Sequence, residues 1–139
     1  MPALRVPLHL RWSDVDAYGH VNNVAIVGLL EQARVLAFWG DADPILPPLT
    51  SSSDVWVLVA DVAVSYKHVI DHRTEPIVAE ISIPKAAGAS FVIAYRLLVD
   101  ELECVTATTT MALVSAATGA PTRMPPELRA QLLAFSETA

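Results

Sequence analysis

The stretch Trp12-Ser-Asp-Val-Asp-Ala-Tyr-Gly-His-Val-Asn-Asn23 leads directly into the apolar segment 24–39. Asparagine is among the best helix N-caps, because its side-chain oxygen accepts hydrogen bonds from the free N–H groups of the first turn. We therefore expect a long helix that starts at Asn22 or Asn23. Glycine is a common helix stop, so we expect the helix to end at Gly40.

The predicted helix is apolar on nearly all sides. At about 1.5 Å per residue it would be about 24 Å long, which is shorter than the hydrocarbon core of a membrane. We therefore expect it to be buried in a protein core. Glu31 and Arg34 are three residues apart, so we expect them to pair on the polar strip of the helix, as a structural pair more than as catalysts.

Five segments have patterns typical of β-strands, namely 6–12, 55–66, 77–83, 91–99 and 104–115. The first alternates apolar and polar residues, with Trp12 on its apolar side. The second begins as a continuous apolar run, which is typical of a central strand. Short connections at 86–89 and 100–103 indicate antiparallel hairpins. Residues 125–135 predict a short amphipathic helix with proline in its first turn.

These elements predict an α+β fold in which a five-stranded antiparallel sheet wraps around the long helix. A second layer is needed where the sheet cannot reach the helix, and we expect another subunit to supply it. The connection 41–54 contains three prolines and three serines, which exclude regular structure. It is either a lid over a binding pocket or a mobile connector, and the sequence leaves both open.

The overall composition excludes several functions. The 139 residues fit a single domain over 1–139, and a formal charge of −6 argues against a nucleic-acid partner. Cys104 is the only cysteine, so it can form neither an intramolecular disulfide nor a thiolate metal cluster, and we expect it to be buried. His68 and His72 have i, i+4 spacing but follow a predicted strand, so we expect no metal site.

The first residues lack the apolar stretch of a secretory signal, so we expect a cytoplasmic protein outside the membrane.

The pattern Asp14-x-Asp16-x-x-Gly19-His20-Val21-Asn22-Asn23, followed by Glu31-x-x-Arg34, resembles the signature of hotdog-fold acyl-CoA thioesterases of the 4-hydroxybenzoyl-CoA thioesterase-like group. The succession of strands is similar too, so the resemblance spans nearly the whole chain. It implies a hotdog fold, a homodimer or homotetramer, and hydrolysis of an acyl-CoA to a free acid and coenzyme A without a cofactor. It also implies that Asp16 is the catalytic carboxylate and that the backbone N–H groups of Asn23 and Val24 hold the thioester oxygen.

Physical chemistry agrees with these roles. A helix N-terminus has free N–H donors and about half a positive charge, which stabilise a developing oxyanion. Gly19 would let the chain turn so that Asp16 and the helix start meet at one carbonyl. Asp14 is expected to be a turn or cap residue. His20 either orients the substrate or the carboxylate, or only satisfies backbone groups.

The remaining candidates concern substrate binding. Asn22 is expected to bind the substrate at the helix start, and Ile26, Val27 and Leu30 are expected to line the acyl pocket in the first turns of the helix. No glycine-rich phosphate loop exists, so the phosphates of coenzyme A would meet cations, for which the candidates are Lys67, His68, Arg73, Lys85 and Arg96. A non-catalytic module that binds acyl-CoA or acyl-carrier protein is the alternative function. A dehydratase of the same fold would need a histidine and acid pair in a different layout.

Overall fold

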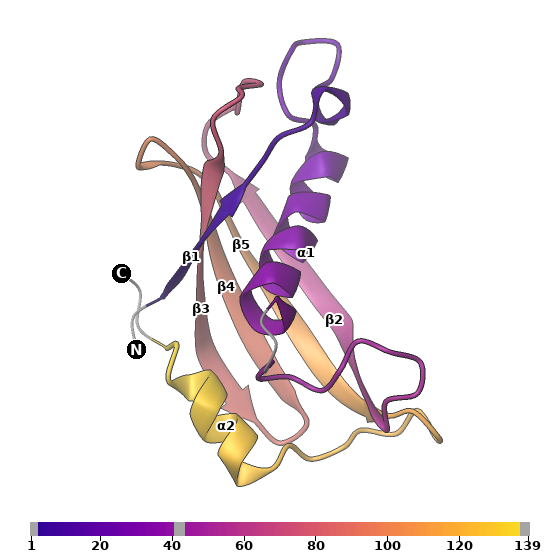
Figure 1. Ribbon diagram of the computed structural model, residues 1–139. Coiled ribbons are helices and arrows are strands. Elements are labelled where there is room, and N and C mark those ends of the chain that lie inside the picture. The colour runs from indigo at the N-terminus through magenta and orange to yellow at the C-terminus, as the bar shows by residue number, and fades with distance from the viewer. Residues whose placement is uncertain (1–2, 41–43, 137–139) are drawn as a thin grey trace.

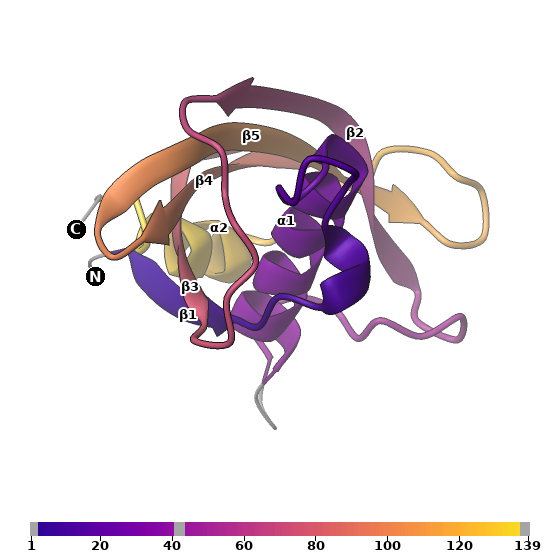
Figure 2. The same ribbon diagram turned by 90° about the horizontal axis from the view of Figure 1, so that it is seen from above.

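The computed structural model describes residues 3–40 and 44–136. One antiparallel sheet has the strand order β1-β3-β4-β5-β2, and the long helix α1 lies against one of its faces (Figure 1). Seen from above, the sheet curves around α1 (Figure 2). The predicted α+β hotdog architecture is therefore confirmed. The elements in chain order are β1 (Leu4–Leu8), the 3-10 turn η1 (Trp12–Asp14), α1 (Asn23–Trp39), β2 (Val55–Tyr66), β3 (Ile77–Ala87), β4 (Ser90–Val99), β5 (Leu102–Ser115) and α2 (Pro126–Leu133).

The centre of the sheet is the meander β3-β4-β5, whose two connections are tight turns, as predicted. Gly88 in the first turn has a φ of +63°, a conformation that glycine adopts without strain. Asp100 and Glu101 in the second turn have φ values of +49° and +69°. Two successive residues at positive φ give the turn type that matches the twist of a β-hairpin.

The core lies between α1 and the concave face of the sheet. Ile26, Leu30 and Phe38 of α1 are buried there, and Tyr95 of β4 is buried on the facing side. The Tyr95 hydroxyl lies 2.7 Å from the hydroxyl of Thr109. Burial raises the pKa of Tyr95, and the bond to Thr109 opposes this rise. The Tyr95 hydroxyl is therefore neutral and hydrogen-bonded inside this core.

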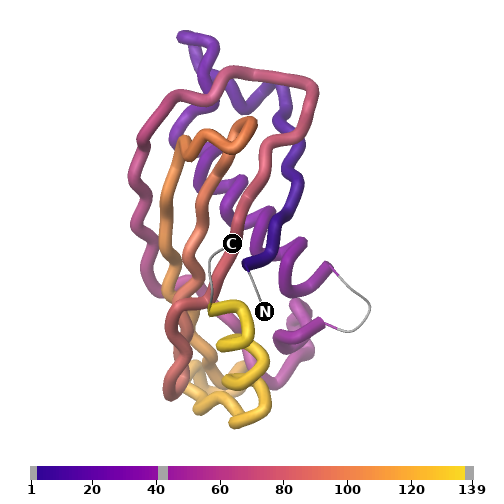
Figure 3. The backbone as a smooth tube through the Cα atoms, turned by 90° about the vertical axis from the view of Figure 1, so that its left-hand side faces the viewer, coloured from indigo at the N-terminus to yellow at the C-terminus, as the bar shows by residue number. Residues whose placement is uncertain are grey.

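The short helix α2 closes the end of the core near the C-terminal end of α1 (Figure 3). Its Leu128 and Leu132 are buried, and the ring of Phe135 packs edge-on against Phe38 at a centroid distance of 6.2 Å. The N–H of Ile83 in β3 donates to the Phe135 carbonyl at 2.8 Å. The amphipathic helix predicted at the end of the chain therefore exists, with slightly narrower bounds.

The ends of α1 confirm the sequence prediction. The side-chain oxygen of Asn22 accepts a hydrogen bond from the Ala25 N–H at 2.8 Å, and Gly40 is the C-cap. Arg34 and Glu31 pair at 3.3 Å. However, one side of α1 is exposed, including Val24 and Leu36. No helix in the described part of the chain is long and apolar enough to cross a membrane.

The first strand is shorter than the predicted range 6–12. It ends at Leu8, and Trp12 starts a 3-10 turn with its side chain 77% exposed instead of lying on the buried side. The Asp14 carboxylate accepts a hydrogen bond from the Arg11 backbone N–H at 2.7 Å, which bends the chain at this point. The apolar alternation continues through Leu10, so periodicity alone could not locate this end.

The second strand was predicted to be central, and this is wrong. β2 lies at an edge of the sheet, paired only with β5, and most of its residues are exposed. Its exposed large apolar side chains are Trp56, Leu58, Val59, Val62 and Tyr66. A continuous apolar run indicates a strand that is covered on both faces, but it does not reveal whether the same chain supplies the cover.

The long connection lies at the end of α1 that is far from residues 12–23 (Figure 1). The Trp39 indole N–H donates to the Pro47 carbonyl at 2.7 Å, and Leu46 is buried. Residues 41–43 are outside the described residues. Because the connection lies at the far end of α1, its described part, 44–54, cannot act as a lid over the start of α1 in its own chain.

Candidate active site

The loop that precedes α1 folds back on itself. Val15 and Val21 form an antiparallel bridge, and the Asp16 N–H donates to the His20 carbonyl at 2.8 Å. Gly19 forms the reversal with a φ of +79°, and its N–H donates to the Asp16 carbonyl at 3.0 Å. A residue with a Cβ would be strained at this φ, which explains glycine here.

Asp16 is exposed at the start of this turn. Its Oδ1 accepts hydrogen bonds from the backbone N–H groups of Tyr18, at 2.8 Å, and His20, at 3.3 Å. Its Oδ2 has no hydrogen-bond partner among the described residues. The carboxylate is therefore held in place through one oxygen, and the other oxygen is available to a bound molecule.

Asp14 is two residues away but only 3% exposed. Its Oδ2 accepts the Arg11 backbone N–H, and its Oδ1 accepts the Arg11 guanidinium at 2.9 Å. Both oxygens are therefore engaged by Arg11, as expected for a turn or cap residue.

The start of α1 offers two free donors. Asn22 occupies the next two N–H groups, because its side chain accepts from Ala25 and its carbonyl accepts from Ile26 at 3.0 Å. The N–H groups of Asn23 and Val24 have no partner in the described part of the chain. Unpaired N–H groups in the first turn of a helix favour negative charge.

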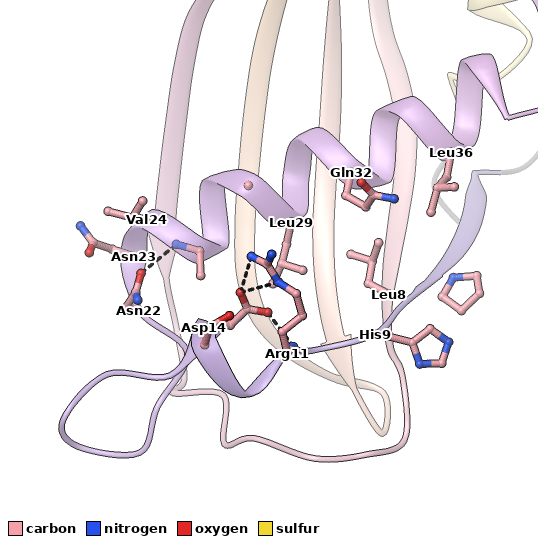
Figure 4. A pocket seen from close by; sticks show the side chains of 14 residues that line it. Leu8, His9, Arg11, Asp14, Asn22, Asn23, Val24, Leu29, Gln32 and Leu36 are labelled. Carbon is pink, nitrogen blue, oxygen red and sulfur yellow. Dashed lines mark hydrogen bonds and ion pairs between the residues drawn. The ribbon is translucent and has the colours of Figure 1, made fainter.

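Two cavities flank the start of α1 and share Asn22 and Asn23. The larger, of about 790 Å³, lies between α1 and the end of β1 with the segment that follows it, and Figure 4 shows Asp14 bound to Arg11 beside it. The smaller, of about 410 Å³, contains Asp16. We regard the smaller cavity as the candidate active site, because it has a carboxylate with an unoccupied oxygen. Its lining residues are Asp16, His20, Val21, Asn22, Asn23, Ile26, Tyr66, Lys67, His68, Val69, Ile70 and Val105.

The structure brings together most of the site residues that the sequence predicts, but not all. Asp16, His20, Asn22, Asn23, Ile26 and Lys67 line the smaller cavity. Val24 lines the larger one. Val27, on a partly exposed turn, and Leu30, in the core, line neither cavity.

The candidate cations differ in whether they line the smaller cavity and in whether a carboxylate already pairs with them. Lys67 and His68 line the smaller cavity. Arg73 is bound to the Asp100 carboxylate at 2.9 Å, and this hydrogen bond raises the pKa of Arg73. Arg96 is bound to Glu80 and Glu103 at 2.8 and 2.7 Å. Lys85 pairs with Val92 near the β3-β4 turn and lines neither cavity.

Several residues that face the site were not predicted. Tyr66, Val69, Ile70 and Val105 supply an apolar wall. Asp71 lies beside the site, with its Oδ1 at 3.5 Å from His20 Nε2. The strand end at Tyr66 and the polar residues after it were visible in the sequence. Nothing in the sequence revealed that this segment would pair with the loop before α1.

The described residues contain no group of three or more histidine, cysteine, aspartate or glutamate side chains that could hold a metal ion. His68 and His72 lie in a loop, and the His72 ring packs edge-on against Trp12 at 5.5 Å. Cys104 is buried, and burial raises the pKa of its thiol. A buried thiol of raised pKa is a poor nucleophile.

The sequence profile of the Thioesterase-like superfamily matches residues 10–132. No curated protein matches the sequence significantly. Many solved structures do match. A protein described as a predicted thioesterase from Bacillus stearothermophilus superimposes with a TM-score of 0.82 and 16% identity, over 99% of this chain and 98% of that chain.

Two further structures are similar over most of their length. A thioesterase from Thermus thermophilus, complexed with coenzyme A and Zn, has a TM-score of 0.78 and 19% identity, over 97% of this chain and 95% of that chain. The DHNA-CoA thioesterase from Staphylococcus aureus has a TM-score of 0.76 and 18% identity, over 88% of this chain and 81% of that chain. At such identities the likeness shows the fold alone.

Proposed function

Because the chain belongs to the thioesterase-like superfamily, we propose that it hydrolyses an acyl-CoA thioester to a free acid and coenzyme A. The observation that carries the proposal is that the free oxygen of Asp16 and Asn23, the first residue of α1 with a free N–H, lie at one cavity, and the free N–H of Val24 is the next in the same turn. Two of the similar structures support the substrate class, since one is a DHNA-CoA thioesterase and another holds coenzyme A.

In this proposal the start of α1 binds the thioester carbonyl oxygen. The N–H groups of Asn23 and Val24 point along the helix axis, so they can stabilise the negative charge that develops on that oxygen. Asp16 either takes a proton from the attacking water or attacks the carbonyl carbon directly. Both routes use Oδ2, since Oδ1 is held by the Tyr18 and His20 N–H groups.

The acyl group would occupy the apolar part of the cavity. Ile26 from α1, Tyr66 from the end of β2 and Val105 from β5 form this part, together with Val69 and Ile70. Lys67 and His68 lie on the same wall and are the cations best placed for the phosphates of coenzyme A. Hydrogen bonds between Arg73 and Asp100 make Arg73 a weaker candidate.

We also propose that the protein is a homo-oligomer in which two copies pair through β2. The strand presents an unpaired edge and a row of exposed apolar side chains, which natural proteins normally cover. Antiparallel pairing of β2 with its copy would form a symmetric interface. It would bring Tyr66 of one chain toward the beginning of β2 in the other. The partner's loop 44–54 would then lie beside the candidate site, and the predicted lid would act between chains.

The catalytic proposal is tested with a set of short, long and aromatic acyl-CoAs and a reagent that detects free thiols. We expect many turnovers per chain with at least one substrate and none with heat-denatured protein. Cys104 can react at most once per chain, so only release beyond one equivalent counts. No release, together with tight acyl-CoA binding by calorimetry, would identify a binding module instead.

The oligomer is tested by light scattering at micromolar concentration. We expect a dimer or a tetramer. Replacing Val62 with lysine puts a charge on the exposed edge and should shift the mass toward the monomer, whereas Val24→Lys on the exposed side of α1 should not disturb a β2 interface. A wild-type protein that is monomeric and fully active would contradict the proposal.

A further inference from the structure

His20 connects two loops that are distant in the sequence. Its backbone forms an antiparallel bridge with Asp71, and the adjacent Val21 N–H donates to the Ile70 carbonyl at 2.8 Å. This pairing places the Asp71 carboxylate next to the imidazole, with 3.5 Å between Asp71 Oδ1 and His20 Nε2. The loop after β2 thus supplies a charged partner to the loop that carries Asp16.

Two carboxylates therefore hold His20 in position. Asp16 holds its backbone N–H, and Asp71 faces its ring nitrogen Nε2. The other ring nitrogen, Nδ1, has no hydrogen-bond partner in the described part of the chain. His20 lines the same cavity as Asp16, so Nδ1 is the ring nitrogen that remains for a bound molecule.

From this geometry we propose that Asp71 is a positioning residue, which orients His20 so that its Nδ1–H donates a proton to the sulfur that leaves the thioester. The inference rests on the proposed thioester hydrolysis. Water oxygen bonds to the carbonyl carbon and its proton passes to Asp16. The carbon–sulfur bond then breaks, its electron pair goes to sulfur, and the sulfur takes the proton of His20 Nδ1. His20 regains a proton from solvent, and Asp16 releases one to solvent.

The pairing has little to contribute to stability. The Asp71 side chain is 81% exposed and that of His20 is 37% exposed. Exposed ion pairs contribute little to stability, because water screens the charges and the side chains lose freedom when they pair. A carboxylate that faces one nitrogen of a histidine can, however, fix the orientation of the ring. The pair is therefore suited to orienting a proton donor. Removing it should hardly change the free energy of unfolding.

The test compares Asp71→Asn with a matched control, Glu101→Gln. Glu101 is also an exposed carboxylate in an ion pair, with Arg5, but it lies on the β4-β5 turn. We expect Asp71→Asn to lower kcat about tenfold with KM within twofold, since general acid catalysis as a whole contributes about 10²–10⁴. Asp71→Glu should recover part of kcat, and Glu101→Gln should match the wild type.

A double-mutant cycle with His20→Gln then separates positioning from any other effect. If Asp71 acts through His20, Asp71→Asn should cause no further loss of kcat in the His20→Gln background. Wild-type kcat in Asp71→Asn, or losses that simply multiply, would overturn the inference while leaving the proposed hydrolysis intact. Absence of turnover in the wild type would overturn both. If the melting temperature of Asp71→Asn is much lower than that of the wild type, Asp71→Glu replaces it in the cycle. If Asp71→Glu then lowers kcat by the same factor in the wild-type and the His20→Gln backgrounds, the inference is overturned.

Discussion

Asp14 and Asp16 are two residues apart on one loop, yet their surroundings are opposite. Asp14 is buried against the larger cavity, and Arg11 engages both of its oxygens. Asp16 is exposed beside the smaller cavity, and the backbone N–H groups of the loop donate only to its Oδ1. The comparison shows that the hydrogen bonds of a carboxylate, more than its position in a motif, decide whether it holds the fold or remains available for chemistry.

The largest expected effect is on catalysis by Asp16. Asp16→Asn keeps an oxygen that can accept the Tyr18 N–H, but the amide cannot take a proton or attack a carbonyl. We expect kcat to fall by about 10²–10⁴ with an unchanged melting temperature. Steady-state kinetics on the best substrate measures this. If the variant kept more than about half of kcat while Asp14→Asn lost it, the two carboxylates would have to exchange roles.

Asp14→Asn should mainly affect stability. The amide retains one acceptor oxygen, so one of the two sets of Arg11 bonds is lost and the charge is removed from a buried site. We expect the free energy of unfolding to fall by about 1–3 kcal/mol. Urea denaturation measures it, with kcat at a temperature well below the transition as the companion measurement. An unchanged midpoint would show that Asp14 does not hold the loop.

The two cavities can be distinguished by filling each of them. Ile26→Phe adds volume at the wall of the smaller cavity, and Leu36→Phe does so in the larger one. Each methylene of the acyl chain contributes about 0.8 kcal/mol to binding when it is buried. In the wild type, kcat/KM should therefore rise up to about fourfold for each added methylene until the cavity is full. Ile26→Phe should shorten the preferred acyl chain, and Leu36→Phe should leave it unchanged. The reverse result would place the acyl group in the larger cavity.

The smallest effect concerns a third aspartate, which pairs with arginine on the surface. The hydrogen bond from Arg73 lowers the pKa of Asp100, and the charge of Arg73 adds to this. The pair therefore stabilises the fold above the unfolded-state pKa of about 3.9 and loses this effect as the pH falls through the lower folded value. Asp100→Asn should lower the melting temperature slightly at pH 7 and not at pH 2. Asparagine tolerates the positive φ of this position, so an equal difference at both pH values would point to the turn and not to the pair.

Local patterns in the sequence predicted α1, its cap at Asn22, the hairpins and the grouping of Asp16, His20 and Asn23. These features depend on residues close together in the chain. The edge position of β2, the exposed Trp12 and the place of the loop 44–54 depend on which distant segments meet. Asp71 illustrates the same limit, because only the pairing of two loops brings it to His20.

The strand order has a consequence for the way the chain folds. The meander β3-β4-β5 joins strands that are consecutive in the chain, whereas Leu4 of β1 pairs with Ile81 and Val55 of β2 with Ser115. Long loops cost more entropy to close, and distant contacts slow folding. We therefore expect the meander to form first and the two outer strands to join it late. Asp16 follows β1 and Asp71 follows β2, so the contact between their loops forms only when both late strands have docked. In native-state hydrogen exchange, the Val21 amide should then lose protection together with β1 and β2, before the amides of β4.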